Sequence, residues 1–235
     1  MTSAPPLTTA PSHAAPDRTP GGRGWAVVGA IAGLAGVVGI QASLSIDAVY
    51  NKKSAGDAEL ITERLEDFVP NLLTLHFAMM TASLLLLVFA AGLRRRLQGQ
   101  APAGSLLPDV AAGGLLLTAV ATLMGVAFST EIIFGITAED PPMDVEFAAV
   151  AAHWIGTVPW LWVGAGVTGL AVAVAAIRHA AAPRWIGWAA AVLGGLTTIA
   201  GMSPLQYMAG FTGPVLVLLL GAGFALGDRS TGRTP

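Results

Sequence analysis

Long runs of apolar residues, separated by short polar segments, dominate the pattern of this chain. The clearest run extends from Val69 to the consecutive arginines Arg94, Arg95 and Arg96, and it contains one histidine. A helix of about 25 residues crosses the roughly 30 Å hydrocarbon layer of a bilayer with some tilt. Because lipid offers no partner to backbone N–H and C=O groups, runs of this length predict helices, and the sequence lacks the alternating pattern of a membrane barrel.

Six such runs predict an all-α, polytopic integral membrane protein. The predicted spans cover residues about 25–46, 69–93, 108–131, 157–177, 185–202 and 206–226. The stretch from Met143 to Ala176 would reach roughly 50 Å, too long for one perpendicular span, so we divide it into a short helix at 144–155 and the span that follows. Pro214 predicts a kink in the last span. The spans form one domain, 25–227, between a disordered cytoplasmic tail at 1–24 and a cytoplasmic C-tail at 228–235.

The polar segment after the first span predicts a short amphipathic helix at 57–68. Asp57 is a suitable N-cap, and Ile61, Leu65 and Phe68 share one face of the helix. This spacing suits a helix on the membrane surface, and the alternative is a solvated, anionic loop. With the helix at 144–155, the expected architecture is a bundle of six transmembrane helices with two short extracytoplasmic surface helices.

Composition narrows the class of protein. Apolar residues make up 54% of the chain and charged residues 11%, whereas soluble proteins carry about a quarter charged residues. The absence of cysteine excludes disulfides, thiolate nucleophiles and thiolate metal sites. No basic run is long enough to indicate nucleic acid binding. The abundance of Ala and Gly, with Arg preferred to Lys, resembles small multi-pass proteins of GC-rich bacteria, a resemblance that covers no specific motif.

The distribution of basic residues predicts how the chain is threaded. Cytoplasmic loops carry an excess of Lys and Arg. One set of loops and tails holds nine arginines, and the other set holds three basic residues, Lys52, Lys53 and Arg64, against eleven carboxylates. The nine are Arg18, Arg23, Arg94, Arg95, Arg96, Arg178, Arg184, Arg229 and Arg233. We therefore expect a cell-membrane protein with both termini in the cytoplasm.

Two ionisable residues stand out inside the predicted spans. His76 lies about 27 Å along its helix from Arg94, within the outer leaflet, and Glu131 has apolar residues on both sides. Ionisable groups in spans are costly and usually face a bundle interior or a cavity. Because the second and third spans are joined by a short loop, we expect His76 and Glu131 to face each other across them. The structural alternatives are a histidine bonded to a neighbouring helix and an acid exposed at the interface.

His153, on the short helix at 144–155, is expected at the level of the outer headgroups. Together His76, Glu131 and His153 are the candidate site for a ligand or cofactor, a set able to bind a haem or a divalent cation. The sequence has no HExxH motif and no EF-hand loop, so it assigns no metal ligands. It identifies neither a catalytic residue nor a particular cofactor.

Three classes of function fit these observations. The first is a non-catalytic accessory or ligand-binding membrane subunit. The second is a membrane-embedded enzyme or redox protein that uses the extracytoplasmic histidines and carboxylates, and the third is a carrier or channel for a small neutral solute. Besides the lipid bilayer, the expected partner is a membrane protein or a second copy of this chain, bound through Gly29, Gly33 and Gly36. Small residues at this spacing let a helix of the partner approach closely.

Overall fold

The computed structural model describes residues 22–48, 51–54, 56–138 and 144–227. The predicted C-tail and most of the predicted N-tail lie outside these residues. The described chain is all-helical, and it contains six helices or helical stretches long and apolar enough to cross a membrane. The predicted fold class, a helical membrane bundle, is confirmed.

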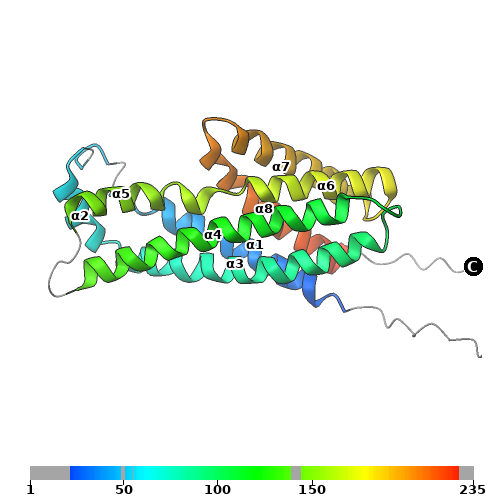
Figure 1. Cartoon of the computed structure of the whole chain (residues 1–235), viewed down its shortest axis with the longest axis horizontal. Helices are drawn as coiled ribbons and strands as arrows, with labels where there is room; N and C mark the ends of the chain where they lie inside the picture. Colours follow the sequence, from blue (N-terminus) through cyan, green and yellow to red (C-terminus); the bar gives the residue numbers. More distant parts are fainter. Residues whose placement is uncertain (1–21, 49–50, 55, 139–143, 228–235) are drawn as a thin grey trace, which may run out of the picture.

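Consecutive spans run in opposite directions along an elongated bundle (Figure 1). Helix α1 packs against α3 and α8, α4 packs between α3 and α6, and α7 packs on α6 and α8. The stretch from α5 to α6 is interrupted by a 3-10 turn, η1, and the last span begins with a 3-10 turn, η2, and ends in a π-helical turn, η3. The elements are α1 Gly24–Leu44, α2 Ala58–Glu66, α3 Val69–Gln98, α4 Leu107–Thr137, α5 Val145–Ile155, η1 Val158–Trp160, α6 Val163–His179, α7 Arg184–Met202, η2 Gln206–Met208, α8 Ala209–Ala222 and η3 Gly223–Gly227.

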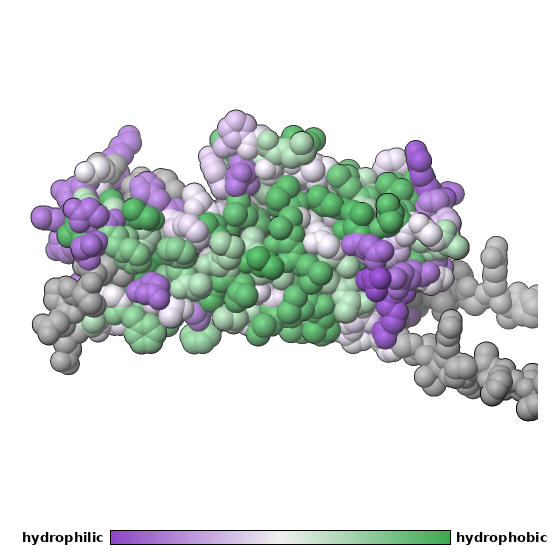
Figure 2. All heavy atoms as spheres, viewed as in Figure 1, coloured by the Kyte–Doolittle hydropathy of each residue, from purple (hydrophilic) through white to green (hydrophobic). Residues whose placement is uncertain are grey.

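Polar residues gather at the two ends of the bundle and apolar residues cover its middle on the face that Figure 2 shows. One end, here the arginine end, carries Arg23, Arg94–Arg96, Arg178 and Arg184, where α1 and α7 begin and where α3 and α6 end. Arg94 there donates to Asp109 at 2.6 Å, in the first turn of α4. The other end, here the acidic end, carries α2, α5 and most of the carboxylates. This separation of charge is the one the sequence predicts.

Helices α3 and α4 are longer than the predicted spans. They contain 30 and 31 residues, so each is about 45 Å long and exceeds the hydrocarbon layer. Helix α3 continues through the three arginines because Leu97 is buried beyond them. Helix α4 continues past Glu131 to Thr137. In contrast, α6 begins at Val163, six residues later than the expected start of that span.

The two short helices pack on the rest of the chain. The predicted N-cap is confirmed, since Asp57 accepts a hydrogen bond from the Leu60 backbone N–H at 3.0 Å. Ile61 and Leu65 are buried as expected, but α2 contacts α5 and α4, so this face rests on protein. Helix α5 lies beside α4, nearly in line with α6 (Figure 1), instead of lying flat on a membrane surface. Together they form a small helical cap at the acidic end.

The glycines of α1 pack against helices of the same chain. A Cβ at Gly29 would overlap the ring of Phe89 on α3, and one at Gly33 would overlap the backbone of Leu218 on α8. A Cβ at Gly36 would meet the ring of Trp162 at 2.6 Å. The prediction of a close-packing face is correct, but all three positions are buried inside the bundle. The expectation that Gly29, Gly33 and Gly36 bind a partner or a second copy is therefore wrong, because α3, α8 and the turn before α6 already occupy this face.

Candidate functional site

The partner of His76 on helix α4 is Ser129. The distance between His76 Nδ1 and Ser129 Oγ is 3.0 Å, and the Ser129 hydroxyl donates to the Val126 carbonyl at 2.7 Å. Since a serine has one hydroxyl hydrogen, His76 Nδ1–H is then the donor to Ser129. A neutral imidazole in this tautomer keeps Nε2 as an acceptor. This contact matches the structural alternative predicted for His76, a histidine hydrogen-bonded to a neighbouring helix.

Glu131 lies two residues after Ser129, on an exposed side of α4. Two residues on an α-helix correspond to a rotation of about 200°, so Glu131 points to nearly the opposite side of α4 from Ser129. Helices α3 and α4 are neighbours at the predicted depth, but the expected direct contact of His76 with Glu131 is wrong. Glu131 instead matches the alternative of an acid exposed near the end of the span.

His153 is exposed near the C-terminal end of α5. In the part of the chain that the structure describes, no three or more histidine, aspartate or glutamate side chains gather as metal ligands would. A role of His76, Glu131 and His153 in binding a ligand or cofactor is not tested by these contacts and stays a prediction.

A cavity of about 510 Å³ lies at the acidic end, among three segments distant in sequence. Its walls come from the end of α1, the break between α5 and α6, and the turn into α8. Polar groups come from Ser43, Asp47 and Thr157, and aromatic rings from Trp160, Tyr207 and Phe211. Cavities of this size, mostly apolar with a few polar groups, are typical of small-molecule sites.

The break between α5 and α6 builds the cavity wall, and Ser43 of α1 holds it in place. Helix α5 ends at Ile155, whose carbonyl has no partner within the helix. The Ser43 hydroxyl donates to this carbonyl at 3.0 Å, and Ser43 Oγ accepts from Trp160 Nε1 at 2.9 Å. Ser43 and Trp160 are buried, so the two hydrogen bonds pair polar groups that would otherwise be costly. Non-helical backbone at membrane depth requires such protein partners.

The aromatic wall depends on small residues in α8. Trp160 packs edge to face against Phe211, with ring centroids 4.9 Å apart. A Cβ at Gly210 would approach the Trp160 ring to 2.6 Å, so only glycine leaves space for this ring. Trp162, which is fully buried, donates its indole N–H to the Pro159 carbonyl at 2.9 Å. These contacts fix both tryptophans and leave the cavity open beside Trp160.

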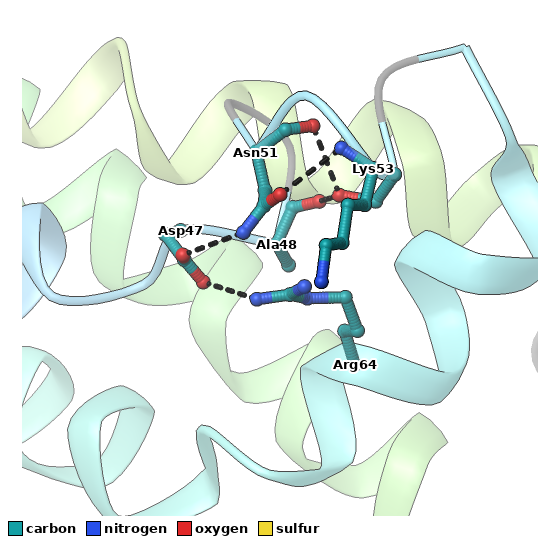
Figure 3. A network of polar contacts seen from close by, with 6 residues as sticks. Asp47, Ala48, Asn51, Lys53 and Arg64 are labelled. Atoms are coloured by element: carbon teal, nitrogen blue, oxygen red, sulfur yellow. Dashed lines mark hydrogen bonds and ion pairs between the residues drawn. The ribbon is translucent and has the colours of Figure 1, made fainter.

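Asp47, on the rim of the cavity, is held by two side chains (Figure 3). Asn51 donates to Asp47 Oδ2 at 3.1 Å, and Arg64 of α2 donates to Oδ1 at 2.8 Å. The hydrogen bond from Asn51 has the largest effect and lowers the pKa of Asp47; burial opposes it, and the hydrogen bond and charge of Arg64 lower this pKa further. Asp47 is therefore a carboxylate at neutral pH, and its ion pair joins α1 to the cap.

The candidate site predicted from the sequence contains none of the residues that line this cavity. The available signal was the segment TVPW at 157–160, where a proline and a threonine interrupt an apolar stretch too long for one span. Ser43 is 117 residues away from Trp160, so no local pattern connects them. Comparison of the chain with protein-family models, curated proteins and solved structures finds no match.

Proposed function

We propose that this protein is a non-catalytic, ligand-binding membrane subunit that takes a small amphipathic molecule into the cavity beside Trp160. The cavity itself is the observation that supports this proposal most directly. Its aromatic rings suit an apolar body, and the oxygens of Asp47 and Thr157 offer hydrogen-bond acceptors to one polar group. The basic residues at the arginine end favour placing that end in the cytoplasm, so the ligand would come from the outer side of a cell membrane.

The depth of the cavity favours a binding protein over a carrier. Helix α1 contains 21 residues and extends about 31 Å from the arginine end, and the cavity is lined by Ser43 in its last turn and by Asp47 just beyond it. In a layer of roughly 30 Å, this places the cavity close to one membrane boundary. Carriers with broken helices typically bind their substrates near the bilayer midplane.

A second candidate is a membrane-embedded enzyme or redox protein that uses His76. The observation that favours it is the Nε2 atom, which the hydrogen bond to Ser129 leaves as an acceptor in the neutral form. A visible absorption spectrum and a metal analysis of the purified protein distinguish the two candidates. A haem band or a stoichiometric metal would favour the second.

The ligand-binding proposal is tested with 4-tert-butylphenol, a probe with an apolar ring and one hydroxyl. Thr157→Trp should fill the cavity, and Thr137→Trp is the matched control. Both threonines are exposed, and the hydroxyl of each donates a hydrogen bond to the backbone carbonyl four residues earlier. We expect binding to the protein in nanodiscs, measured by ligand-observed NMR, to weaken at least tenfold in Thr157→Trp alone. Should Thr157→Trp not fold, Phe211→Ala removes one wall of the cavity instead. Equal binding by wild type, control and either cavity variant would overturn the proposal.

A further inference from the structure

A second hollow lies on the outer surface of the bundle, between α1 and α3. It is shallow and open along its length, and it consists of two adjoining parts of about 390 and 540 Å³, which share Val38 and Thr74. Its α1 side is formed at a helical spacing of three or four residues, from Ile31 to Ser45. The two parts are therefore one groove that runs along the helix axes.

The chemistry of the groove changes along its length. The part near the acidic end contains Gln41, Ser45, Asn71 and Thr74. The part that continues toward the middle of the bundle is lined mainly by apolar side chains such as Leu34, Leu73 and Phe77, which are exposed outside the bundle. Such a gradient matches an amphiphile that lies parallel to the helices.

The dimensions match one leaflet of a bilayer. From Ile31 to Ser45 the groove extends 14 residues, or about 21 Å. Half of the hydrocarbon layer is about 15 Å, and the headgroup region adds several ångströms. Helix α1 contains 21 residues and spans about 31 Å, so Ser45 lies at one membrane boundary and Ile31 beyond the midplane.

Two side-chain amides at the polar end of the groove are available for hydrogen bonding to a ligand. In the described part of the chain, no hydrogen bond involves the side-chain amide of Gln41 or of Asn71. An amide at the edge of the hydrocarbon layer gains from a partner, and the ester and phosphate oxygens of a lipid lie at this level. No charged residue lines either part of the groove, so nothing there attracts an anionic headgroup.

We infer that this groove holds one zwitterionic glycerophospholipid, with its ester region on Gln41 and Asn71 and an acyl chain along Leu34, Leu73 and Phe77. This site is separate from the cavity beside Trp160 and does not depend on the proposed function. A lipid held there would fill the surface between α1 and α3 and would persist after the surrounding lipids are exchanged.

The test uses native mass spectrometry of the protein released into detergent from nanodiscs that contain equal amounts of phosphatidylcholine and phosphatidylglycerol. We expect one retained phosphatidylcholine on the wild type, and about tenfold lower affinity in Gln41→Leu/Asn71→Leu, because each amide hydrogen bond accounts for roughly threefold. Gln98→Leu, the same change on an exposed glutamine of the arginine end, is the control and should retain the lipid.

Three outcomes would overturn the inference. Equal retention in all variants would mean ordinary boundary lipid, and preferential retention of phosphatidylglycerol would contradict the headgroup assignment. A dimer mass that disappears in Ala35→Trp, a change that fills the apolar part of the groove, would show that a second copy occupies it. Thermal unfolding of each variant confirms that the loss of lipid is not a loss of fold.

Discussion

Removing the hydroxyl of Ser43 should destabilise the protein, because this one atom pairs two buried polar groups. In Ser43→Ala, the indole N–H of Trp160 and the carbonyl of Ile155 both lose their partner. Ser43 is 5% exposed and Trp160 is 4% exposed, so little water is available to replace these hydrogen bonds.

The expected magnitude follows from hydrogen bonds measured in membrane proteins. An average of about 0.6 kcal/mol for each of two bonds gives a loss of about 1.2 kcal/mol, and an N–H left unsatisfied raises this to about 2 kcal/mol. For a protein of this size, a loss of about 1–2 kcal/mol lowers the melting temperature by roughly 2–8 °C. The cost should be smaller in a Trp160→Phe background, where the indole donor no longer exists.

The assay is thermal unfolding of the purified protein in detergent, followed by tryptophan fluorescence. Ser45→Ala is the matched control, since Ser45 is exposed and bonds the Gln41 carbonyl of its own helix. We expect the control to change stability by less than about 0.5 kcal/mol. Equal melting temperatures of Ser43→Ala and Ser45→Ala would refute the proposed role of Ser43 at the helix break. The same would follow if Ser43→Ala lowered the stability equally in the wild-type and Trp160→Phe backgrounds.

Three further predictions follow from the same structure. Lys52→Cys at the acidic end should react with an impermeant thiol reagent in intact cells and Gln98→Cys should not, and the opposite result would reverse the proposed orientation. Leu65→Asp should detach α2 and expose the cap to protease, because Leu65 is fully buried; an unchanged digestion rate would contradict this packing. His76→Ala should lower the melting temperature, whereas Glu131→Gln should change it by no more than about 1 °C, as is usual for a substitution on the protein surface. Equal decreases in the two variants would instead indicate that His76 and Glu131 form a pair.

The spans and the separation of charge could be predicted from sequence because they depend on local properties. A run of apolar residues has no other stable form in lipid than a helix, and Arg94–Arg96 mark one end of the bundle regardless of how the helices pack. The Asp57 cap is equally local, since it joins residues three apart. Helix lengths were less accurate because Leu97 is buried by tertiary contacts beyond the arginines.

The contacts between helices could not be predicted, because each depends on helix rotation. The expected depth of His76 correctly predicted the part of α4 that it lies beside, but it did not predict which side chain it contacts. Ser129 and Glu131 are only two residues apart, and the rotation of α4 turns Ser129 toward His76. The glycines of α1 show the same limit. Their spacing indicates close packing, yet only the three-dimensional arrangement shows that the neighbours are α3, α8 and the turn before α6 of the same chain.

The tight helix packing in the half of the bundle toward the arginine end favours ligand binding over transport of a solute. Helices α4 and α6 meet there with backbone in contact, since a Cβ on Gly114 or on Gly164 would overlap the carbonyl oxygen of the other. Thr168 of α6 donates to the Ala111 carbonyl of α4 at 2.8 Å, and Ser83 of α3 donates to the Ala119 carbonyl at 2.8 Å. A solute that passed between these helices would have to separate packed backbones and leave buried hydroxyls unpaired, at a cost of about 1–3 kcal/mol for each group. A ligand in the cavity beside Trp160 requires no such opening, because that cavity lies at the acidic end, outside this packed region.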